Sequence, residues 1–387
     1  MTKIRKFEIN ENYVDEIVLR YWAFDWDDNI LDMPTKILMD QKVGSDWKPV
    51  EVSTAEFAQV RNDTENYQIR NGSIQEAFSE FRDNGLRGEE AFIEDVEHCI
   101  AESHFAPAFE KFLECLSEGG VFAIITARGH QPESIKRGVE YIIDNILTQR
   151  PGSVTGMTMA DEMFQNLKKF KYWFEGKSDN QFKLSGKPSS NPIVQEYLSH
   201  CDYFGVSSES FAKKFSGGTV QAPEESKKQA LMYSINRCYE YAKQLEEIMN
   251  RPVRVTYGMS DDDPKTSKAI IQLFQDITNE DSELSKYISL YYFQTTGGVV
   301  DKTKFKPNTE TKPSVQNIKE SSHQATGLES SVMPFTKWNN MTQRLYPSSS
   351  DNRTNDFANQ MKNQIGYTSG LSKDIFKQFR YKRKKKK

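Results

Sequence analysis

Aspartates are concentrated at two points of the sequence, each directly after an apolar segment. Asp25, Asp27 and Asp28 follow "EIVLRYWAF" (16–24), and a second group follows "PVRVTYGM" (252–259). This second group consists of Asp261, Asp262 and Asp263. Carboxylates a few ångströms apart repel one another, and a hard divalent cation such as Mg²⁺ removes that conflict. The two groups therefore predict a magnesium site, provided that the fold brings them together.

Apolar segments alternate with amphipathic ones along the chain. We predict buried strands at 16–24, 121–126, 203–208 and 252–259. Helices are predicted between them, most clearly at 132–147 and 223–250, each of which begins with a proline. This alternation indicates an α/β fold with a parallel sheet and helices on both faces. Ligands of such sheets bind beyond the carboxyl ends of the strands, where the aspartates, Thr126 and Arg128 are expected to lie.

Long segments separate the first predicted strands. Residues 34–54 are typical of a β-hairpin with a turn near 44–46, and residues 55–118 are expected to be mostly helical. Either 55–105 or 150–220, or both, is long enough to form a cap over the strand ends.

The composition changes at about residue 300. Residues 301–387 hold 18 Lys and Arg against 7 Asp and Glu, whereas the whole chain has a net charge of −4. Because apolar residues are isolated there, we expect a packed part at 1–299 and a largely disordered basic tail at 300–387, with short docking segments at "MPFTKW" and "DIFKQF". Three interpretations of the tail stay open. It is a solvated tail without a partner, an arm that binds nucleic acid through its phosphates, or a segment that docks on a membrane surface or a protein.

Other features of the sequence exclude several classes of protein. The four cysteines are far apart and form no CxxC pair, which argues against a zinc ribbon or a disulfide scaffold. No stretch approaches the roughly 20 apolar residues of a membrane span, and "MTKIRKFEIN" is not followed by the apolar run of a secretory signal. We therefore expect a soluble cytoplasmic protein without a membrane partner.

Four short motifs resemble those of the haloacid dehalogenase (HAD) superfamily of phosphohydrolases, and they occur in the order of that family. They are "AFDWDDNIL" (23–31), "VFAIITAR" (121–128), "SKKQAL" (226–231) and "VTYGMSDDD" (255–263). The resemblance extends from about residue 16 to 270 and leaves the tail outside. It implies a Rossmann-like three-layer fold, with a flap hairpin at 34–54 and inserted cap segments.

The resemblance also implies roles for the aspartates. Asp25 would be the nucleophile that forms an aspartyl-phosphate. Asp27 would protonate the leaving oxygen and then activate water. Asp25, and Asp27 through its backbone carbonyl, would bind Mg²⁺ together with Asp261, for which Asp262 is the second candidate. The carboxylate at position 27 favours phosphate esters, since the dehalogenases of the family lack one there.

Basic and hydroxyl side chains would complete such a site. By the resemblance, Thr126 would donate a hydrogen bond to a phosphoryl oxygen, and Lys227 would stabilise the nucleophile and the phosphoryl charge. Lys228 is a close rival as this lysine and as a substrate-binding residue, and Lys187 is a third candidate. Arg128 has two open interpretations, which are binding of the substrate and pairing with a buried carboxylate.

Each of these residues also has a structural interpretation. Asp25 and Asp27 could close a turn after a strand, residues 261–263 could cap a helix, and Lys227 could be an ordinary exposed helix residue. Asn29 departs from the family, which often has Thr or Val at its position. The histidines show no metal-ligand spacing and are interpreted as structural or surface residues, and His130 alone stays open to a role in the site because it closely follows a strand end.

The expected function is that of a Mg²⁺-dependent phosphatase that hydrolyses a phosphomonoester through an aspartyl-phosphate. The alternative is a catalytically inactive HAD-like module for binding or scaffolding, whose basic tail binds nucleic acid or a protein partner. The phosphorylated substrate stays open among a metabolite, a phosphosugar, a nucleotide and a nucleic-acid end.

Overall fold

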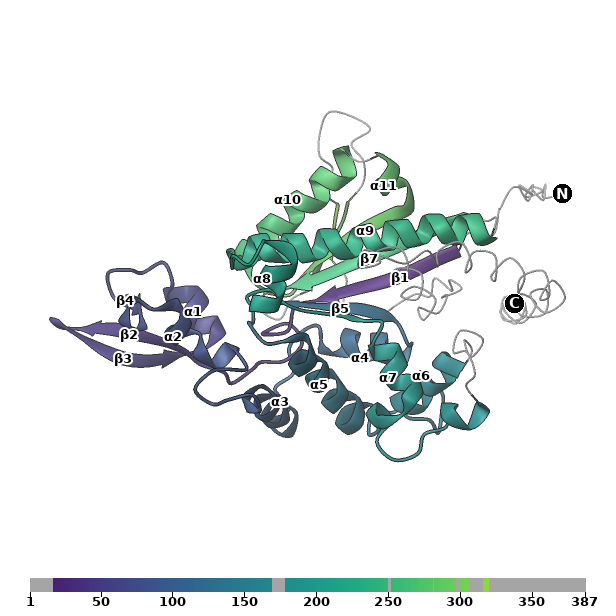
Figure 1. The fold of residues 1–387 in the computed structure, drawn as a ribbon, viewed down its shortest axis with the longest axis horizontal. Coiled ribbons are helices and arrows are strands. Elements are labelled where there is room, and N and C mark those ends of the chain that lie inside the picture. Colours follow the sequence, from purple (N-terminus) through teal and green to yellow (C-terminus); the bar gives the residue numbers. More distant parts are fainter. Residues whose placement is uncertain are drawn as a thin grey trace, which may run out of the picture.

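The computed structural model describes residues 17–168, 178–249, 252–280, 282–296, 300–305 and 316–319. Together they form an α/β protein with a mostly parallel central sheet (Figure 1). In spatial order its strands are β10 (Gln316–Lys319), β9 (Asp301–Lys304), β8 (Ile288–Gln294), β7 (Val253–Asp261), β1 (Ile17–Phe24), β5 (Val121–Thr126) and β6 (Asp202–Gly205). Strands β8 to β6 run parallel, and β9 and β10 are antiparallel.

The central strand β1 is aligned with both of its neighbours at its carboxyl end. Phe24 lies opposite Ser260 of β7 and Ile124 of β5. All six residues of β5 are buried, as expected for an apolar strand covered on both faces. The predicted strands at 16–24, 121–126 and 252–259 are thus confirmed. The aspartates that follow β1 and the last residue of β7 emerge at one edge of the sheet.

Helices cover both faces of the sheet (Figure 1). One face is covered by α9 (Pro223–Met249), α10 (Pro264–Glu280) and α11 (Ser282–Tyr287), and the other by α4 (Phe109–Ser117), α5 (Pro132–Ile142), α6 (Met159–Lys168) and α7 (Pro192–Leu198). Helix α3 (Ala91–Glu102) packs against α5, and a π-helical turn, Ile143–Leu147, continues α5. Helix α8 (Glu209–Phe215) follows strand β6 in the chain. The 3-10 helical turns are Arg70–Gly72, Ser79–Phe81, Asp179–Phe182 and Pro188–Ser190. The helices predicted at 132–147 and 223–250 are confirmed.

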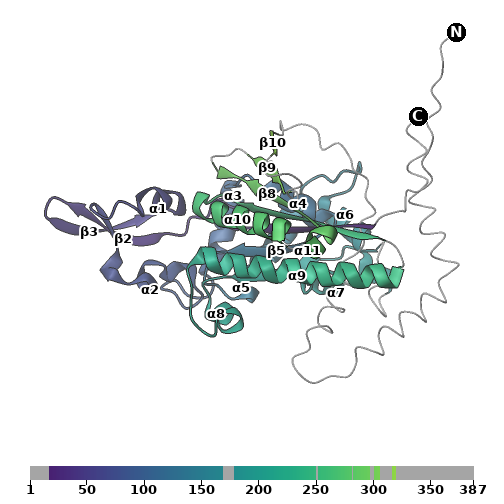
Figure 2. The same cartoon turned by 90° about the horizontal axis from the view of Figure 1, so that it is seen from above.

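A second, antiparallel sheet projects from the main body (Figures 1 and 2). Its strands, in spatial order, are β3 (Asp46–Val52), β2 (Ile37–Val43) and β4 (Tyr67–Ile69), and it is accompanied by α1 (Thr54–Val60) and α2 (Ile74–Ala77). We call residues 37–81 the flap. The predicted hairpin is confirmed, with Gly44 at the turn in a left-handed conformation (φ 68°). The prediction of mostly helix over 55–118 missed β4, which pairs with β2.

Two features of the sheet edge were not predicted from the sequence. Strand β8 was missed, because its aromatic sequence follows α11 without an intervening turn residue. Within the tail that was predicted to be largely disordered from residue 300, β9 pairs with β8 and Phe305 packs on Phe274, with ring centroids 5.4 Å apart. The backbone groups of the β8 edge provide this pairing, which composition cannot reveal. The predicted docking segments "MPFTKW" and "DIFKQF" lie outside the described residues.

None of the helices within the described ranges combines the length and the apolar character that crossing a bilayer requires.

Gly138, in the middle of α5, lies where α5 meets α3 and the turn after β1. A Cβ atom at this position would lie 2.9 Å from Phe92 Cε1 and 3.0 Å from Trp26 Cη2. Alanine is ordinarily about 1 kcal/mol better than glycine inside a helix. Here we expect Gly138→Ala to lower the free energy of unfolding by about 1–3 kcal/mol, because of overpacking. Urea denaturation would measure the change.

The same substitution in a Phe92→Leu background is the control, since that background removes the nearest clashing atom. The loss caused by Gly138→Ala should be smaller there. An increase in stability on Gly138→Ala alone would contradict the packing described for α5.

Candidate functional site

Three carboxylates from two neighbouring strands meet at the carboxyl edge of the sheet. Asp25 follows β1, Asp261 ends β7 and Asp262 comes next. One ligand oxygen from each lies within 4.8 Å of the others. Asp25 is 6% exposed and Asp261 is fully buried. The predicted convergence of the two aspartate groups is therefore confirmed.

Lys227, the fifth residue of α9, is the cation that reaches this cluster. Its Nζ donates hydrogen bonds to Asp25 Oδ2 and to Asp261 Oδ2, both at 2.7 Å, and its side chain is 2% exposed. Burial opposes the charge of Lys227, but the two carboxylates outweigh this effect and raise its pKa well above the ordinary value. Lys227 therefore provides one positive charge among three acidic groups.

The acidic groups remain short of positive charge. Burial raises the pKa of Asp25 to about 7, although Lys227 acts in the opposite direction. Burial and repulsion from Asp25 and Asp261 raise the pKa of Asp262 to about 9. Burial also raises the pKa of Asp261. Clustered oxygen ligands with uncompensated charge are the donor set that a hard divalent cation prefers, so these residues fit Mg²⁺.

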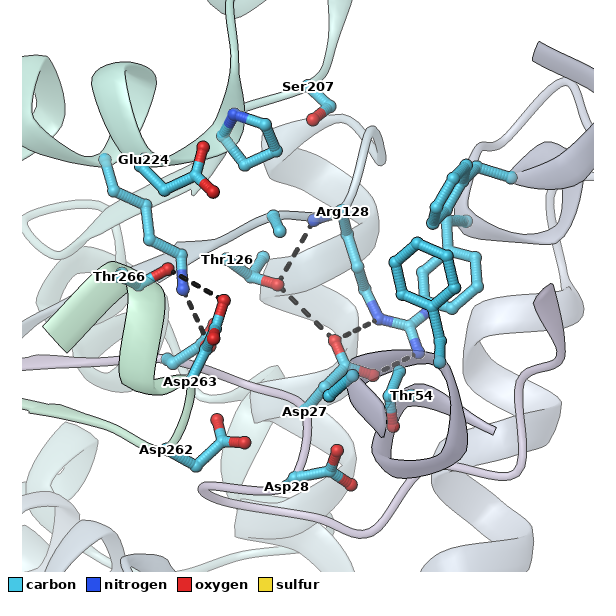
Figure 3. Close-up of a pocket in the computed structure, with 18 of the residues that line it drawn as sticks. Asp27, Asp28, Thr54, Thr126, Arg128, Ser207, Glu224, Asp262, Asp263 and Thr266 are labelled. Carbon is cyan, nitrogen blue, oxygen red and sulfur yellow. Dashed lines mark hydrogen bonds and ion pairs between the residues drawn. The ribbon is translucent and has the colours of Figure 1, made fainter. Parts of the chain in front are cut away.

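Asp27 and Arg128 form a second charged pair beside the cluster (Figure 3). Arg128 Nε and Nη2 donate to the two carboxylate oxygens of Asp27 at 2.8 and 2.7 Å, and Nη2 also donates to Thr35 Oγ1. The guanidinium lies 4.7 Å from the ring centroid of Phe81 and 5.3 Å from that of Phe92, and the side chain is 1% exposed. Of its two open interpretations, the structure shows the pairing with a carboxylate.

Thr126, the last residue of β5, lies between these two groups. Its Oγ1 accepts a hydrogen bond from the backbone N–H of Arg128 at 3.3 Å and lies 3.5 Å from Asp27 Oδ2 (Figure 3). The side chain is among those that line the cavity in front of the strand ends.

Asn29 fastens the turn after β1 to the neighbouring strands. Its Nδ2 donates to the carbonyl of Asp25 and to Ser260 Oγ, both at 3.0 Å, and its Oδ1 accepts from Thr295 Oγ1 at 2.9 Å. The preceding residue, Asp28, adopts a left-handed conformation with φ 54°. Asn29, which departs from the family pattern, thus holds the ends of β1, β7 and β8 together, a role that the sequence did not reveal.

The rival lysines lie elsewhere. Lys228 is paired with Glu225 on α9, and Lys187 is exposed beside a 3-10 turn. Neither is among the residues that line the cavity, within the ranges that the structure describes. Asp263 caps α10 by accepting from the N–H of Lys265, as its structural interpretation predicted, and it also pairs with Arg61 of the flap at 3.0 Å.

A cavity of about 1960 Å³ lies between the strand ends and the flap. Asp27, Asp28 and Asp262 face it, with Thr54 of the flap close to Asp28 (Figure 3). Burial raises the pKa of Asp28, to which the sequence gave no role, to about 6. Aromatic side chains form other parts of the wall, and they are Phe57, Phe78, Phe81, Phe105 and Phe109. Residues 207–224 contribute as well, so both predicted cap regions reach the cavity.

The chain was compared with models of protein families, with curated proteins and with solved structures. None of these comparisons returned a match. The functional interpretation therefore depends on the geometry of the site itself.

The carboxylate cluster makes a prediction about magnesium. With Mg²⁺ at 10 to 100 times its dissociation constant, binding should raise the free energy of unfolding by about 1.4–2.7 kcal/mol. Asp262→Asn should remove most of this gain and raise the stability without Mg²⁺, because it relieves repulsion. Thermal unfolding with and without MgCl₂ measures both effects. Asp263→Asn is the matched control and should keep the gain, since Asp263 pairs with Arg61. Equal responses of the two variants would argue against the proposed ligands.

His130 makes a prediction about acid stability. It is fully buried, and neither ring nitrogen has a hydrogen-bond partner among the described residues. Burial, reinforced by Arg128, lowers its pKa from 6.5 to about 2. Below pH 6.5 the unfolded chain therefore binds a proton that the folded chain does not, so stability falls as the pH falls.

When the pH falls from 7.5 to 5.5, this difference in proton binding should lower the free energy of unfolding by about 1.4 kcal/mol. Urea denaturation of wild type and His130→Leu at the two pH values would reveal it as a smaller loss in the variant. The same loss in both proteins would show that His130 titrates normally.

Proposed function

We propose that the chain is a Mg²⁺-dependent phosphatase of the HAD type, with a Rossmann-like core, that hydrolyses a phosphomonoester through an aspartyl-phosphate at Asp25. The observation that supports this best is the convergence of Asp25, Lys227, Asp261 and Asp262 at the carboxyl ends of two adjacent parallel strands. The four motifs that resemble the family supply the reaction type, and the cavity provides room for a substrate.

In this mechanism Asp25 is held ready to attack phosphorus. Its Oδ2 accepts from Lys227, and its Oδ1 accepts from the backbone N–H of Trp26 at 2.8 Å. Bound Mg²⁺, held by Asp25, Asp261 and Asp262, would supply positive charge that keeps the nucleophile ionised and neutralises the phosphoryl oxygens. Lys227 and the Thr126 hydroxyl would stabilise the charge that develops on the transferred group.

Asp27 would transfer the proton in both steps, the formation of the aspartyl-phosphate and its hydrolysis. As Asp25 bonds to phosphorus, the bond to the ester oxygen breaks, and Asp27 gives that oxygen a proton. Asp27 then takes a proton from water, whose oxygen bonds to phosphorus while the bond to Asp25 breaks. Arg128 orients Asp27 for this task, but the pair must loosen before an oxygen of Asp27 can carry a proton.

The second candidate function is that of an inactive HAD-like binding module. The observation that favours it is the same pair, because both oxygens of Asp27 accept hydrogen bonds from Arg128. If the pair never opens, Asp27 cannot act as a proton donor, and the cavity could only bind its ligand.

Phosphate release from p-nitrophenyl phosphate in Mg²⁺ distinguishes the two candidates. We expect Asp25→Asn to lower kcat by at least about 10³-fold, because it removes the nucleophile. Lys227→Ala should lower kcat by about 10²–10³-fold, because it removes charge stabilisation. Lys228→Ala is the matched control and should retain the wild-type rate.

Release by the wild type that is negligible and equal to that of Asp25→Asn, over a broad panel of phosphomonoesters, would refute the phosphatase. Binding of a phosphorylated ligand without turnover would then favour the module.

A further inference from the structure

The cationic side chains that line the cavity are almost all paired with acids. Arg61 pairs with Asp263, Arg128 with Asp27, Lys213 with Glu209, Lys227 with Asp25 and Asp261, and Lys265 with Glu224. Arg82 is the exception, since in the part of the chain that the structure describes its guanidinium has no ion pair or hydrogen bond. The charge of this half-buried side chain is therefore available to a ligand.

The backbone on both sides of Arg82 is fixed to the loop that follows β5. The carbonyl of Phe81 accepts from the N–H of Gly129 at 2.9 Å, and Asp83 Oδ2 accepts from the N–H of Gln131 at 2.7 Å. A Cβ on Gly129 would lie 3.1 Å from Arg82 Cγ, so the stem of Arg82 packs closely on this loop. Arg82 thus packs against the loop that carries Arg128. Asp83, its neighbour in sequence, accepts its hydrogen bond from Gln131 rather than from Arg82.

The size of the cavity leaves room for more than one phosphoryl group. Ligand pockets for small molecules commonly measure about 300–1,000 Å³, and this one is about 1960 Å³. The planar fork of a guanidinium matches the oxygens of a phosphate or a carboxylate. An unpaired arginine on the wall of a large cavity therefore suits an anionic group that lies apart from the one at Asp25.

We propose that Arg82 binds a second anionic group of the substrate, so that the preferred substrates are phosphomonoesters that also carry another phosphate or a carboxylate. This inference rests on the proposed function of the Asp25 site. Within it, Arg82 is a residue that determines specificity, whereas the groups around Asp25 perform the chemistry.

Two matched pairs of substrates test the proposal with the full chain in Mg²⁺. Adenosine 5′-monophosphate and adenosine 3′,5′-bisphosphate differ by a second phosphate, and glycerol 3-phosphate and 3-phosphoglycerate differ by a carboxylate. We expect kcat/KM to favour the doubly anionic member of at least one pair by about tenfold or more. The pair that shows the preference identifies the second anion.

Arg82→Gln should abolish this preference through KM and leave the hydrolysis of p-nitrophenyl phosphate unchanged. Lys213→Gln, which removes a paired cation from the same cavity, should keep the preference. Equal kcat/KM within both pairs, or a preference that survives Arg82→Gln, would overturn the proposal while the phosphatase stands.

A binding measurement separates this proposal from the proposed function. Calorimetry with Asp25→Asn, alone and combined with Arg82→Gln, uses the same four compounds and needs no turnover. If the wild type hydrolyses neither these compounds nor any member of the broad phosphomonoester panel, the phosphatase assignment fails. Tighter binding of a doubly anionic compound that is lost on Arg82→Gln would still support the role of Arg82, and equal binding within both pairs would refute it.

Discussion

The ammonium group of Lys227 lies between two buried carboxylates, and the arrangement of the sheet edge depends on it. Asp25 directly follows the central strand and Asp261 ends its neighbour, so the register in which β1 and β7 pair brings their charges together. Removing one partner of a buried ion pair typically costs about 3–5 kcal/mol, because a charge is left unpaired. The start of α9 at Pro223 places Lys227 at the beginning of the second helical turn, where its side chain reaches both carboxylates.

The charges at this edge are balanced in two different ways. Arg128 donates hydrogen bonds to both carboxylate oxygens of Asp27, and its guanidinium packs near the rings of Phe81 and Phe92. The group around Asp25 is left with excess negative charge, since Asp262 has no cation of its own within the described residues. The charge of Asp27 is thus balanced by Arg128, whereas the group around Asp25 favours the binding of a further cation.

Local patterns in the sequence predicted the features that depend on local physics. Strands β1, β5 and β7 are rich in β-branched and aromatic residues, which made them recognisable as buried strands. The parallel topology then predicted that the aspartates at the carboxyl ends of β1 and β7 lie close together. The choice between Lys227 and Lys228 was also accessible. Ala230, Leu231, Ile235 and Cys238 recur at helical spacing and are buried, and Lys227 falls on their face of α9, whereas Lys228 does not.

Contacts between distant segments could not be predicted in this way. The partners of Asn29 lie 231 and 266 residues further along the chain, and no local pattern indicates an amide that joins three strand ends. Strand β9 has no apolar residue of its own and forms on the exposed edge of β8. The pairing of Arg128 with Asp27 likewise appears only once β1 and β5 are neighbours.

The flap forms its own sheet with its own small apolar core, and few polar contacts join it to the main body. Arg61 with Asp263, and the carbonyl of Phe81 with Gly129, are two of these contacts. Part of the cavity wall, formed by the flap, is therefore encoded in a stretch of the sequence that is separate from the strand ends. A change in the sequence or length of residues 37–81 would therefore reshape this part of the wall while Asp25, Asp261 and Asp262 keep their positions, as long as those few contacts are preserved.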